Sequence, residues 1–175
     1  MYNILKKMIS IPSVCGREDK LATAIADMIA PFVDECRIDP MGNLIACRRG
    51  TADKDAKKLL LCAHMDEIGF MVTAVEDSGY VRVAPLGGIG WQAAAYSVVL
   101  FENGTHGVLV PDDGVKPEDY KAESFCIDIG AASRRDAERK VKIGDCAILE
   151  PRLTKLMGRR IAGRPLDDKI GCAIR

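Results

Sequence analysis

The alternation of short β-like runs and turns is the feature that most limits how this chain can fold. Between about Phe70 and Ile161, turn signals such as Asp77-Ser78-Gly79 and Asn103-Gly104 separate short runs rich in β-branched and aromatic residues. Strands at this spacing are typical of a small barrel or sandwich. The predicted strands are 70–75, 80–85, 96–102, 107–110, 125–129 and 146–150. One helix is predicted among them at 134–141, with Ser133 as its cap.

The segments on either side have a different pattern. A short helix is predicted over Tyr2 to Ile9, and a second where Leu21, Ile25 and their neighbours recur at helical spacing. A hairpin is expected over 35–48, around Pro40-Met41-Gly42. The continuous apolar run Leu59 to Ala63 predicts a strand covered on both faces in an α/β sheet.

These patterns predict an α/β domain that is interrupted by a β-rich insertion. Residues 1–69 would form the first part of the α/β domain, 70–161 the insertion, and 162–175 the return to the α/β domain. The last helix, which follows Leu166-Asp167-Asp168, has no end signal before Arg175. We therefore expect the host domain to be cut short.

Composition excludes several classes of partner. The 25 lysines and arginines balance 25 aspartates and glutamates, so the net charge gives no reason to expect nucleic acid or an anionic membrane. No apolar run reaches eighteen residues and no leader pattern opens the chain, so we expect a soluble, cytoplasmic protein. The seven scattered cysteines form no Cys-x-x-Cys pair, which argues against a disulfide framework and a thiolate zinc site. Most are expected to be small core residues.

His64-Met65-Asp66 is a candidate metal motif at the end of the apolar run. A metal-binding histidine usually donates its other ring N–H to a carboxylate, which fixes the tautomer. On an extended backbone, residues two apart point to the same side, so Asp66 can take this role for His64. A surface histidine beside an unrelated aspartate remains the alternative.

Asp167-Asp168 is a second candidate, with two possible uses. A carboxylate here could bridge two metal ions, one oxygen serving each, or the pair could cap the helix that follows. Because the two motifs flank the β-rich segment, they would lie together if that segment is an insertion. The basic residues Arg159, Arg160, Arg164 and Lys169 are expected to form a solvated face, although a basic group beside a carboxylate-rich site could also balance its charge. The other histidine, His106, is expected to be exposed and non-ligating.

The segment Ala63 to Phe70 resembles the first metal motif of the tetrahedral (TET) aminopeptidase family. That family includes glutamyl and deblocking aminopeptidases and proteins sometimes labelled endoglucanases. The order and spacing of further similar segments cover nearly the whole chain: 12–18, 85–89, 127–131, 143–145 and 166–171.

The resemblance implies a phosphorylase/peptidase-like α/β/α sandwich interrupted by a PDZ-like β-barrel that serves assembly. It also implies a pair of divalent ions, zinc or cobalt, with His64 and Asp167 as metal ligands, Asp167 bridging the ions and Asp66 orienting the histidine as its catalytic role. Asp168 would follow Asp167 through a cis peptide bond. A metal-activated water would hydrolyse N-terminal residues from peptides, and the enzyme would be a homo-oligomer, a dodecamer in the family.

The sequence also departs from the family pattern. The family's catalytic glutamate, the glutamate ligand beside it, a later acidic ligand and a second histidine find no match before Arg175. Glu67 is a poor substitute for the base, since its side chain is expected to point away from that of Asp66. We therefore expect an inactive N-terminal fragment of a metallo-aminopeptidase.

Two other functions stay open. The β-rich segment could be a non-catalytic assembly or peptide-binding module. A glucanase is less well supported, because glycoside hydrolysis needs two placed carboxylates and sugar grooves ordinarily use several aromatic faces, whereas Trp91 is the only tryptophan.

Overall fold

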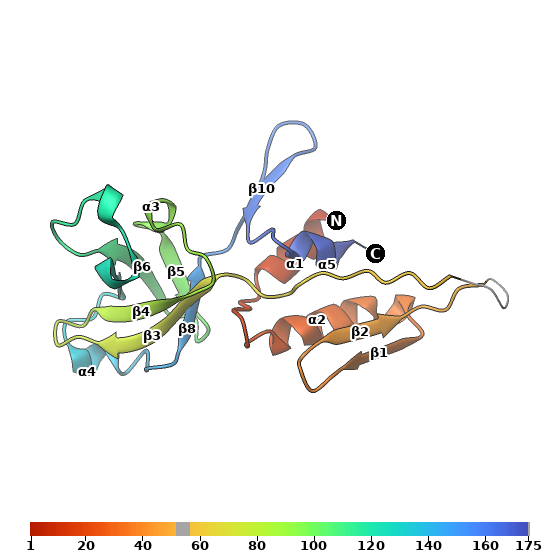
Figure 1. Ribbon diagram of the computed structural model, residues 1–175, viewed down its shortest axis with the longest axis horizontal. Coiled ribbons are helices and arrows are strands. Elements are labelled where there is room, and N and C mark those ends of the chain that lie inside the picture. The colour runs from red at the N-terminus through yellow and green to blue at the C-terminus, as the bar shows by residue number, and fades with distance from the viewer. Residues whose placement is uncertain (52–56, 175) are drawn as a thin grey trace. The chain divides into compact units, whose positions relative to one another are not determined.

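The computed structural model describes residues 1–51 and 57–174, which divide into two compact units (Figure 1). The first comprises residues 1–66 and 152–175, and the second is Glu67–Pro151. The architecture is a mixed α/β chain that contains a small closed β-barrel. The insertion boundaries of 70–161 stay a prediction. The hairpin formed by residues 152–164 clusters with the first unit.

The first unit contains three α-helices and two hairpins among its described residues. They are α1 (Tyr2–Ile9), α2 (Asp19–Ile29), the hairpin β1 (Glu35–Ile38) and β2 (Leu44–Cys47), the hairpin β9 (Arg152–Lys155) and β10 (Ile161–Arg164), and α5 (Lys169–Ala173). A 3-10 turn, Ala30–Phe32, follows α2. The helices predicted near residues 2–9 and 21–32 and the hairpin over 35–48 are confirmed, whereas β9–β10 was not predicted.

Three helices share the core of this unit. Leu5, Met8 and Ile9 of α1 are fully buried, as expected for residues that recur on one helical face. Leu21 and Ile25 of α2 and Ala173 of α5 belong to the same apolar cluster. The short helix α5 is therefore anchored on α1 and α2, which gives the loop before it a rigid base.

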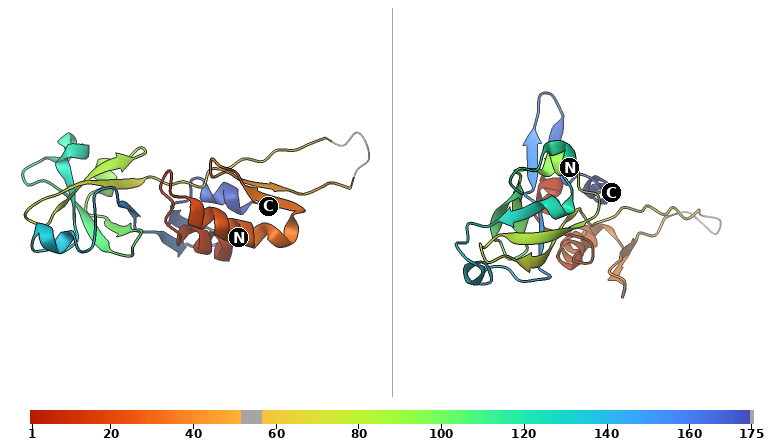
Figure 2. Two further views of the ribbon diagram at one scale, coloured as in Figure 1. Left: turned by 90° about the horizontal axis from the view of Figure 1, so that it is seen from below. Right: turned by 60° about the vertical axis from the view of Figure 1, so that its left-hand side comes forward.

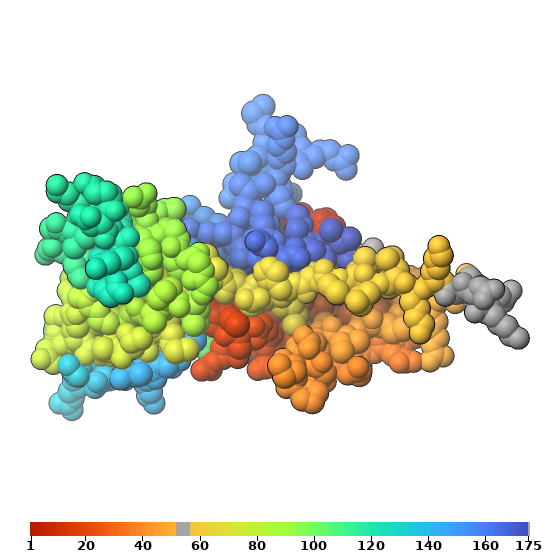
Figure 3. Space-filling model, in the orientation of Figure 1, coloured from red at the N-terminus to blue at the C-terminus, as the bar shows by residue number. Residues whose placement is uncertain are grey.

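The prediction of a buried strand at Leu59 to Ala63 is wrong for this structure. Leu59 and Leu60 are each 84% exposed, and residues 57–66 form neither helix nor strand. The segment lies on the surface (Figure 3, yellow). A strand needs neighbours whose backbone groups pair with its own. No described strand supplies that ladder, so the apolar pattern is present without the sheet that it would complete.

The second unit is a closed six-stranded barrel, with the strand order β3-β4-β7-β6-β5-β8. Its strands, coloured from yellow-green to blue, curve around one another (Figure 2). The strands are β3 (Gly69–Val75), β4 (Val81–Leu86), β5 (Val98–Phe101), β6 (His106–Pro111), β7 (Phe125–Asp128) and β8 (Cys146–Leu149). Each predicted run corresponds to one of them. Alternate residues point inward, as in β4, where Val81 and Val83 are buried.

Aromatic side chains fill the barrel. Phe70, Phe101 and Phe125 are at most 1% exposed. Trp91, from the short helix α3 (Trp91–Ala94), stacks on Phe125 with ring centroids 5.0 Å apart, and Tyr120 meets the same ring edge-on at 4.9 Å. Tyr120 lies between two 3-10 turns, Pro117–Asp119 and Ala122–Ser124. Phe125 is thus the centre of an aromatic cluster.

The helix predicted at 134–141 is confirmed in a shorter form, α4 (Arg134–Ala137). The hydroxyl of Ser133 accepts a hydrogen bond from the Asp136 N–H, as the capping pattern predicted.

The expectation that most cysteines are core residues is wrong. Only Cys126 and Cys146 are buried, Cys172 is half-buried, and Cys15, Cys36, Cys47 and Cys62 are exposed. The exposed cysteines lie on the β1–β2 hairpin or outside regular elements, where little covers them.

In the described part of the chain, no helix is long and apolar enough to cross a membrane.

Arg82 joins three segments of the barrel. Its guanidinium donates to the carboxylates of Glu76 and Asp112 and to the Phe125 carbonyl oxygen. The same carboxylates raise the pKa of Arg82 further above its already high value. Arg82 is about a third exposed, so the ion pairs are only partly screened by water.

Arg82→Met is expected to lower the free energy of unfolding of the barrel by about 1–3 kcal/mol, because two partly buried carboxylates lose their shared donor. Urea denaturation followed by tryptophan fluorescence would measure it, since Trp91 lies in this core. Arg134→Met is the matched control. Its ion pair with Asp77 is exposed, so its loss should cost at most about 1 kcal/mol. Equal effects of the two changes would contradict this account of Arg82.

Candidate metal centre

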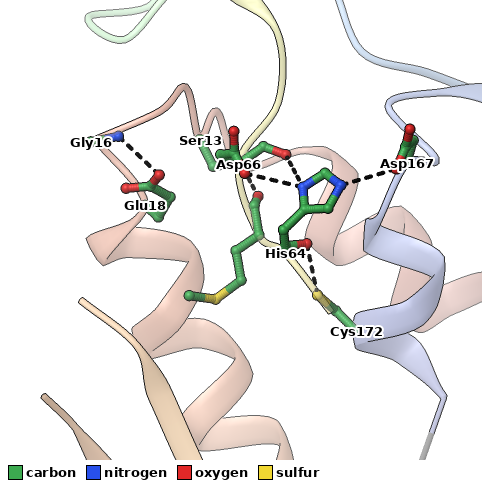
Figure 4. A network of polar contacts seen from close by, with 8 residues as sticks. Ser13, Gly16, Glu18, His64, Asp66, Asp167 and Cys172 are labelled. Carbon is green, nitrogen blue, oxygen red and sulfur yellow. Dashed lines mark hydrogen bonds and ion pairs between the residues drawn. The ribbon is translucent and has the colours of Figure 1, made fainter. Parts of the chain in front are cut away.

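The imidazole of His64 lies between two carboxylates of the first unit (Figure 4). Its Nδ1 is 3.0 Å from Asp66 Oδ1, and its Nε2 is 3.0 Å from Asp167 Oδ1. The two aspartates lie on different segments, since 103 positions separate His64 from Asp167. The structure thus brings together the three residues that the sequence selected.

The two ring nitrogens face different groups. Asp66 meets Nδ1 twice, through its carboxylate and through its main-chain oxygen at 3.2 Å. This arrangement favours a proton on Nδ1. Nε2 also lies at hydrogen-bond distance from a carboxylate, so its contact with Asp167 needs a proton on that nitrogen as well. Asp66 can therefore fix the proton on Nδ1, and only loss of the Nε2 proton would free a lone pair for a metal ion.

Asp167 and Asp168 divide the two uses that the sequence left open. Asp168 is the N-cap of α5, and its Oδ1 accepts from the Gly171 N–H at 3.0 Å. A Cβ at Gly171 would lie 2.5 Å from Asp168 Oδ2, which explains glycine at that position. The Asp167 side chain is 95% exposed beside His64, so its second oxygen is open to solvent. The peptide bond between the two aspartates is cis.

The carboxylates and the neighbouring thiol give the site its electrostatics. The hydrogen bond to Asp167, supported by Asp66, raises the pKa of His64 above its ordinary value. A metal ion at Nε2 would have to displace a proton, so metal and proton compete for this nitrogen. Burial raises the pKa of Cys172, whose Sγ lies 3.3 Å from the His64 carbonyl oxygen. The neutral thiol is suited to donate to that oxygen and is not a thiolate ligand.

The donor set fits a divalent ion in part. Imidazole nitrogen and carboxylate oxygen are donors that zinc accepts, and two donors on a tetrahedral zinc are about 3.3 Å apart for bonds of about 2.0 Å. The Nε2–Oδ1 separation of 3.0 Å is close to that value. Within residues 1–51 and 57–174, however, no group of three or more His, Cys, Asp or Glu side chains is arranged for a metal. These residues therefore offer two ligands of a site that needs more.

Two residues near the site were missed or misplaced by the sequence. Lys169 was expected on a solvated basic face, but it is fully buried, and its Nζ donates to the Ile11 carbonyl oxygen at 3.2 Å. Arg159 and Arg160 are exposed as expected, whereas Arg164 is half-buried. Ser13 is also fully buried and donates to the Met65 carbonyl oxygen at 2.9 Å. Its place in the 12–18 motif, and that of Lys169 directly after the aspartates, were the available signals.

Glu67 and His106, which the sequence analysis also considered for the site, lie outside the group formed by His64, Asp66 and Asp167. Glu67 is 7% exposed and belongs to the second unit. His106 is exposed at the start of β6, as expected, with its Nε2 3.6 Å from Glu150 Oε1.

Comparison with known proteins identifies relatives along almost the whole chain. The chain is 38% identical to a candidate aminopeptidase of Acetivibrio thermocellus, with 99% of this chain and 52% of the relative covered. It is 33% identical to a lysyl aminopeptidase of Pyrococcus furiosus, with 97% and 51% covered. The chain therefore spans about half the length of these relatives.

Solved structures of related proteins have the same fold. An aminopeptidase of the archaeon Desulfurococcus kamchatkensis superimposes with a TM-score of 0.88 at 30% identity, covering 98% of this chain and 49% of that one. The TET1 peptidase of Pyrococcus horikoshii, which can assemble into a tetrahedron or a large octahedral shell, gives 0.81 at 30% identity, covering 97% and 52%. A Thermotoga maritima protein described as an endoglucanase gives 0.83 at 35% identity, covering 96% and 51%.

The family profile agrees with these relatives. The M42 glutamyl aminopeptidase profile matches residues 42–175, a segment that includes His64, Asp66, Asp167 and the whole barrel. The resemblance inferred from the short motifs is thereby confirmed. This chain belongs to the M42 glutamyl aminopeptidase family.

Proposed function

We propose that the chain contributes the first part of the active site of a dinuclear metallo-aminopeptidase, which removes N-terminal residues from peptides. The observation that supports this most strongly is the position of the His64 ring, whose Nδ1 contacts the Asp66 carboxylate and whose Nε2 contacts the Asp167 carboxylate. A metal ligand, the carboxylate that orients it and a second carboxylate ligand would be arranged in this way.

In this proposal each residue has a separate task. Asp66 holds the proton on Nδ1, so that His64 would present its Nε2 lone pair to an ion that displaces the Nε2 proton. Asp167 presents one oxygen beside that lone pair and leaves the other in solvent, where it could serve a second ion. Asp168 keeps the loop on the N-terminus of α5 through its cap to Gly171. A bound divalent ion, zinc or cobalt, would act as a Lewis acid that activates water and polarises the peptide carbonyl.

We propose that the remaining ligands and the general base lie in a region corresponding to the half of the relatives that this chain does not cover. Zinc sites that catalyse reactions normally use three protein ligands. The described residues bring two of them together, which is too few to hold the ion firmly.

The isolated 175-residue chain is expected to show no aminopeptidase turnover with saturating Zn²⁺ or Co²⁺. The reason is that it provides two metal ligands and no placed base among its described residues. Release of p-nitroaniline from leucine, lysine and glutamate anilides would measure it, with mass spectrometry to verify the chain. Turnover that disappears in His64→Ala would contradict this expectation, because the chain would then hold a complete site.

We further propose that the barrel is a PDZ-like assembly domain inserted at residues 70–161 of an α/β/α sandwich, and that the complete enzyme is a homo-oligomer. The closed barrel and the tetrahedral or octahedral assemblies of the Pyrococcus horikoshii relative support this. The alternative is that the barrel is purely an assembly or peptide-binding module, which predicts oligomers that do not depend on His64.

We also propose the cytoplasm as the location of the protein, with which the free state of all seven cysteines is compatible.

The endoglucanase description of the Thermotoga maritima relative suggests a second function. Cleavage of a glucan needs two carboxylates across the glycosidic bond and, ordinarily, aromatic faces for the sugar. Trp91, however, is engaged by Phe70 and Phe125 in the barrel core. We therefore favour the peptidase.

A further inference from the structure

Three side chains tie together the two segments that carry His64 and Asp167. The hydroxyl of Ser13 donates to the Met65 carbonyl oxygen at 2.9 Å, in the peptide between His64 and Asp66. Nζ of Lys169 donates to the Ile11 carbonyl oxygen at 3.2 Å. The third contact is Cys172 Sγ on the His64 carbonyl oxygen at 3.3 Å. We call these three side chains, Ser13, Lys169 and Cys172, the three-donor bracket.

The bracket closes a triangle of segments within the first unit. Ser13 joins residues 11–13 to residues 64–66, Cys172 joins residues 64–66 to α5, and Lys169 joins α5 back to residues 11–13. Each contact runs from a side chain to a backbone oxygen, so it fixes the path of the main chain. His64 lies at one corner of this triangle, and Asp167 comes two residues before Lys169, at the start of the corner formed by α5.

Burial makes the bracket firm. Ser13 and Lys169 are both 0% exposed, and Cys172 is packed against the α1, α2 and α5 core. A fully buried lysine is rare unless its charge is satisfied by hydrogen bonds or ion pairs, and moving it would leave polar groups without water. In contrast, the Asp167 side chain is 95% exposed and the His64 side chain 53% exposed. The side chains proposed to bind the metal therefore lie at the surface, while the side chains that hold their backbones lie in the interior.

We propose that Ser13 and Lys169 are positioning residues, which set the spacing between His64 Nε2 and Asp167 and so prepare the site for its ion. This inference rests on the proposed function and names residues that act through the ligands without touching the ion. A preorganised pair of ligands avoids part of the ordering cost of binding. Loss of a group that orients a ligand typically weakens metal affinity by about 10- to 100-fold.

The test uses the whole 175-residue chain and Mn²⁺, a paramagnetic ion that the exposed thiols bind poorly. Binding is read from broadening of the Asp167 amide signal and the His64 ring signals in NMR spectra. Ser13→Ala and Lys169→Met are each expected to weaken apparent Mn²⁺ affinity by about 10-fold or more. The matched controls are Ser10→Ala and Lys20→Met, whose parent side chains are exposed, and these should bind as the unchanged chain does.

A metal-free measurement separates this inference from the proposed function. Nuclear Overhauser contacts between the His64 ring and the Asp167 β protons report the spacing directly, and they should weaken in Ser13→Ala and Lys169→Met. If the unchanged chain bound no Mn²⁺ while these contacts still depended on Ser13 and Lys169, the proposed function would fail and the positioning role would stand.

Conservative variants distinguish positioning from general stability. Ser13→Thr keeps the hydroxyl, whereas Ser13→Val introduces a side chain with the shape of threonine but without the hydroxyl. Only the threonine variant should therefore retain the contacts between the His64 ring and Asp167 and the Mn²⁺ affinity. Lys169→Arg should likewise retain more of both than Lys169→Met. If the chain does not fold with a substitution at Ser13, the Lys169 variants and Cys172→Ala test the same geometry. If it does not fold with a substitution at Lys169, the Ser13 variants and Cys172→Ala do so. Unchanged ring contacts and Mn²⁺ affinity in folded Ser13→Ala and Lys169→Met would overturn the proposal, even if melting temperatures fell.

Discussion

His64→Ala is expected to weaken the affinity of the chain for a divalent ion by about 100-fold or more, above the 10- to 100-fold cost of losing a mere orienting partner. The reason is that His64 is the nitrogen donor of a two-donor site, and Asp167 alone is a single exposed carboxylate. Mn²⁺ broadening of the Asp167 and Asp168 amide signals would measure the change. The substitution should leave the fold intact, because His64 is exposed.

The chain provides a close control for this experiment. His106 is the other of its two histidines, is also exposed and also lies near a carboxylate, Glu150. His106→Ala should leave Mn²⁺ binding unchanged. Asp66→Asn should fall between the two, since the ligand remains but the group that orders its tautomer is weakened. Binding that vanished in His106→Ala and persisted in His64→Ala would contradict the assignment of the site.

Phe125→Ala is expected to lower the free energy of unfolding of the barrel by about 3–5 kcal/mol, the range for removing a fully buried phenylalanine. Phe125 is 0% exposed and contacts both Trp91 and Tyr120, so its loss opens a cavity and removes two ring contacts. Chemical denaturation followed by Trp91 fluorescence would measure it. A matched surface change, Tyr80→Ala, concerns a ring that is 40% exposed and should cost clearly less. Comparable losses for the two would show that the aromatic cluster is not the centre of the core.

The same variant separates the two units. Because the metal donors belong to the first unit and Phe125 to the second, Phe125→Ala is expected to leave the His64–Asp167 ring contacts unchanged at temperatures where the barrel stays folded. Their loss together with the barrel would indicate that the two units do not fold independently.

Local sequence patterns predicted most of the fold. The helix α1 and the six barrel strands follow from spacing and turn residues, since each element carries its own periodicity and its own flanking turn. Which strands pair does not follow locally, because β3 and β5 both pair with the distant β8. The hairpin β9–β10 was missed because its strands are short and neither carries a strand signal. Residues 152–155 contain a single apolar residue, and residues 161–164 include a glycine and show no clear alternation. Leu59 to Ala63 failed for the opposite reason. Its apolar pattern is strong, but whether it becomes a strand depends on partners that local sequence does not supply.

The candidate site could be predicted as far as its donors and no further. His64, Asp66 and Asp167 carry side chains whose chemistry is visible in the sequence, and a short motif marks each position. Ser13 and Lys169 act through backbone oxygens of Met65 and Ile11, and any residue has such an oxygen. Only the fold shows that these partners are close, and only burial shows that Lys169 is not a surface charge.

Anomalous diffraction at the zinc edge, from crystals of this chain grown with Zn²⁺, would show whether His64 and Asp167 bind the same ion. We expect an ion within about 2.0–2.2 Å of both His64 Nε2 and an Asp167 carboxylate oxygen, with Asp66 still bonded to Nδ1. Zinc found only on the exposed thiols, with His64 Nε2 still hydrogen-bonded to Asp167, would contradict it.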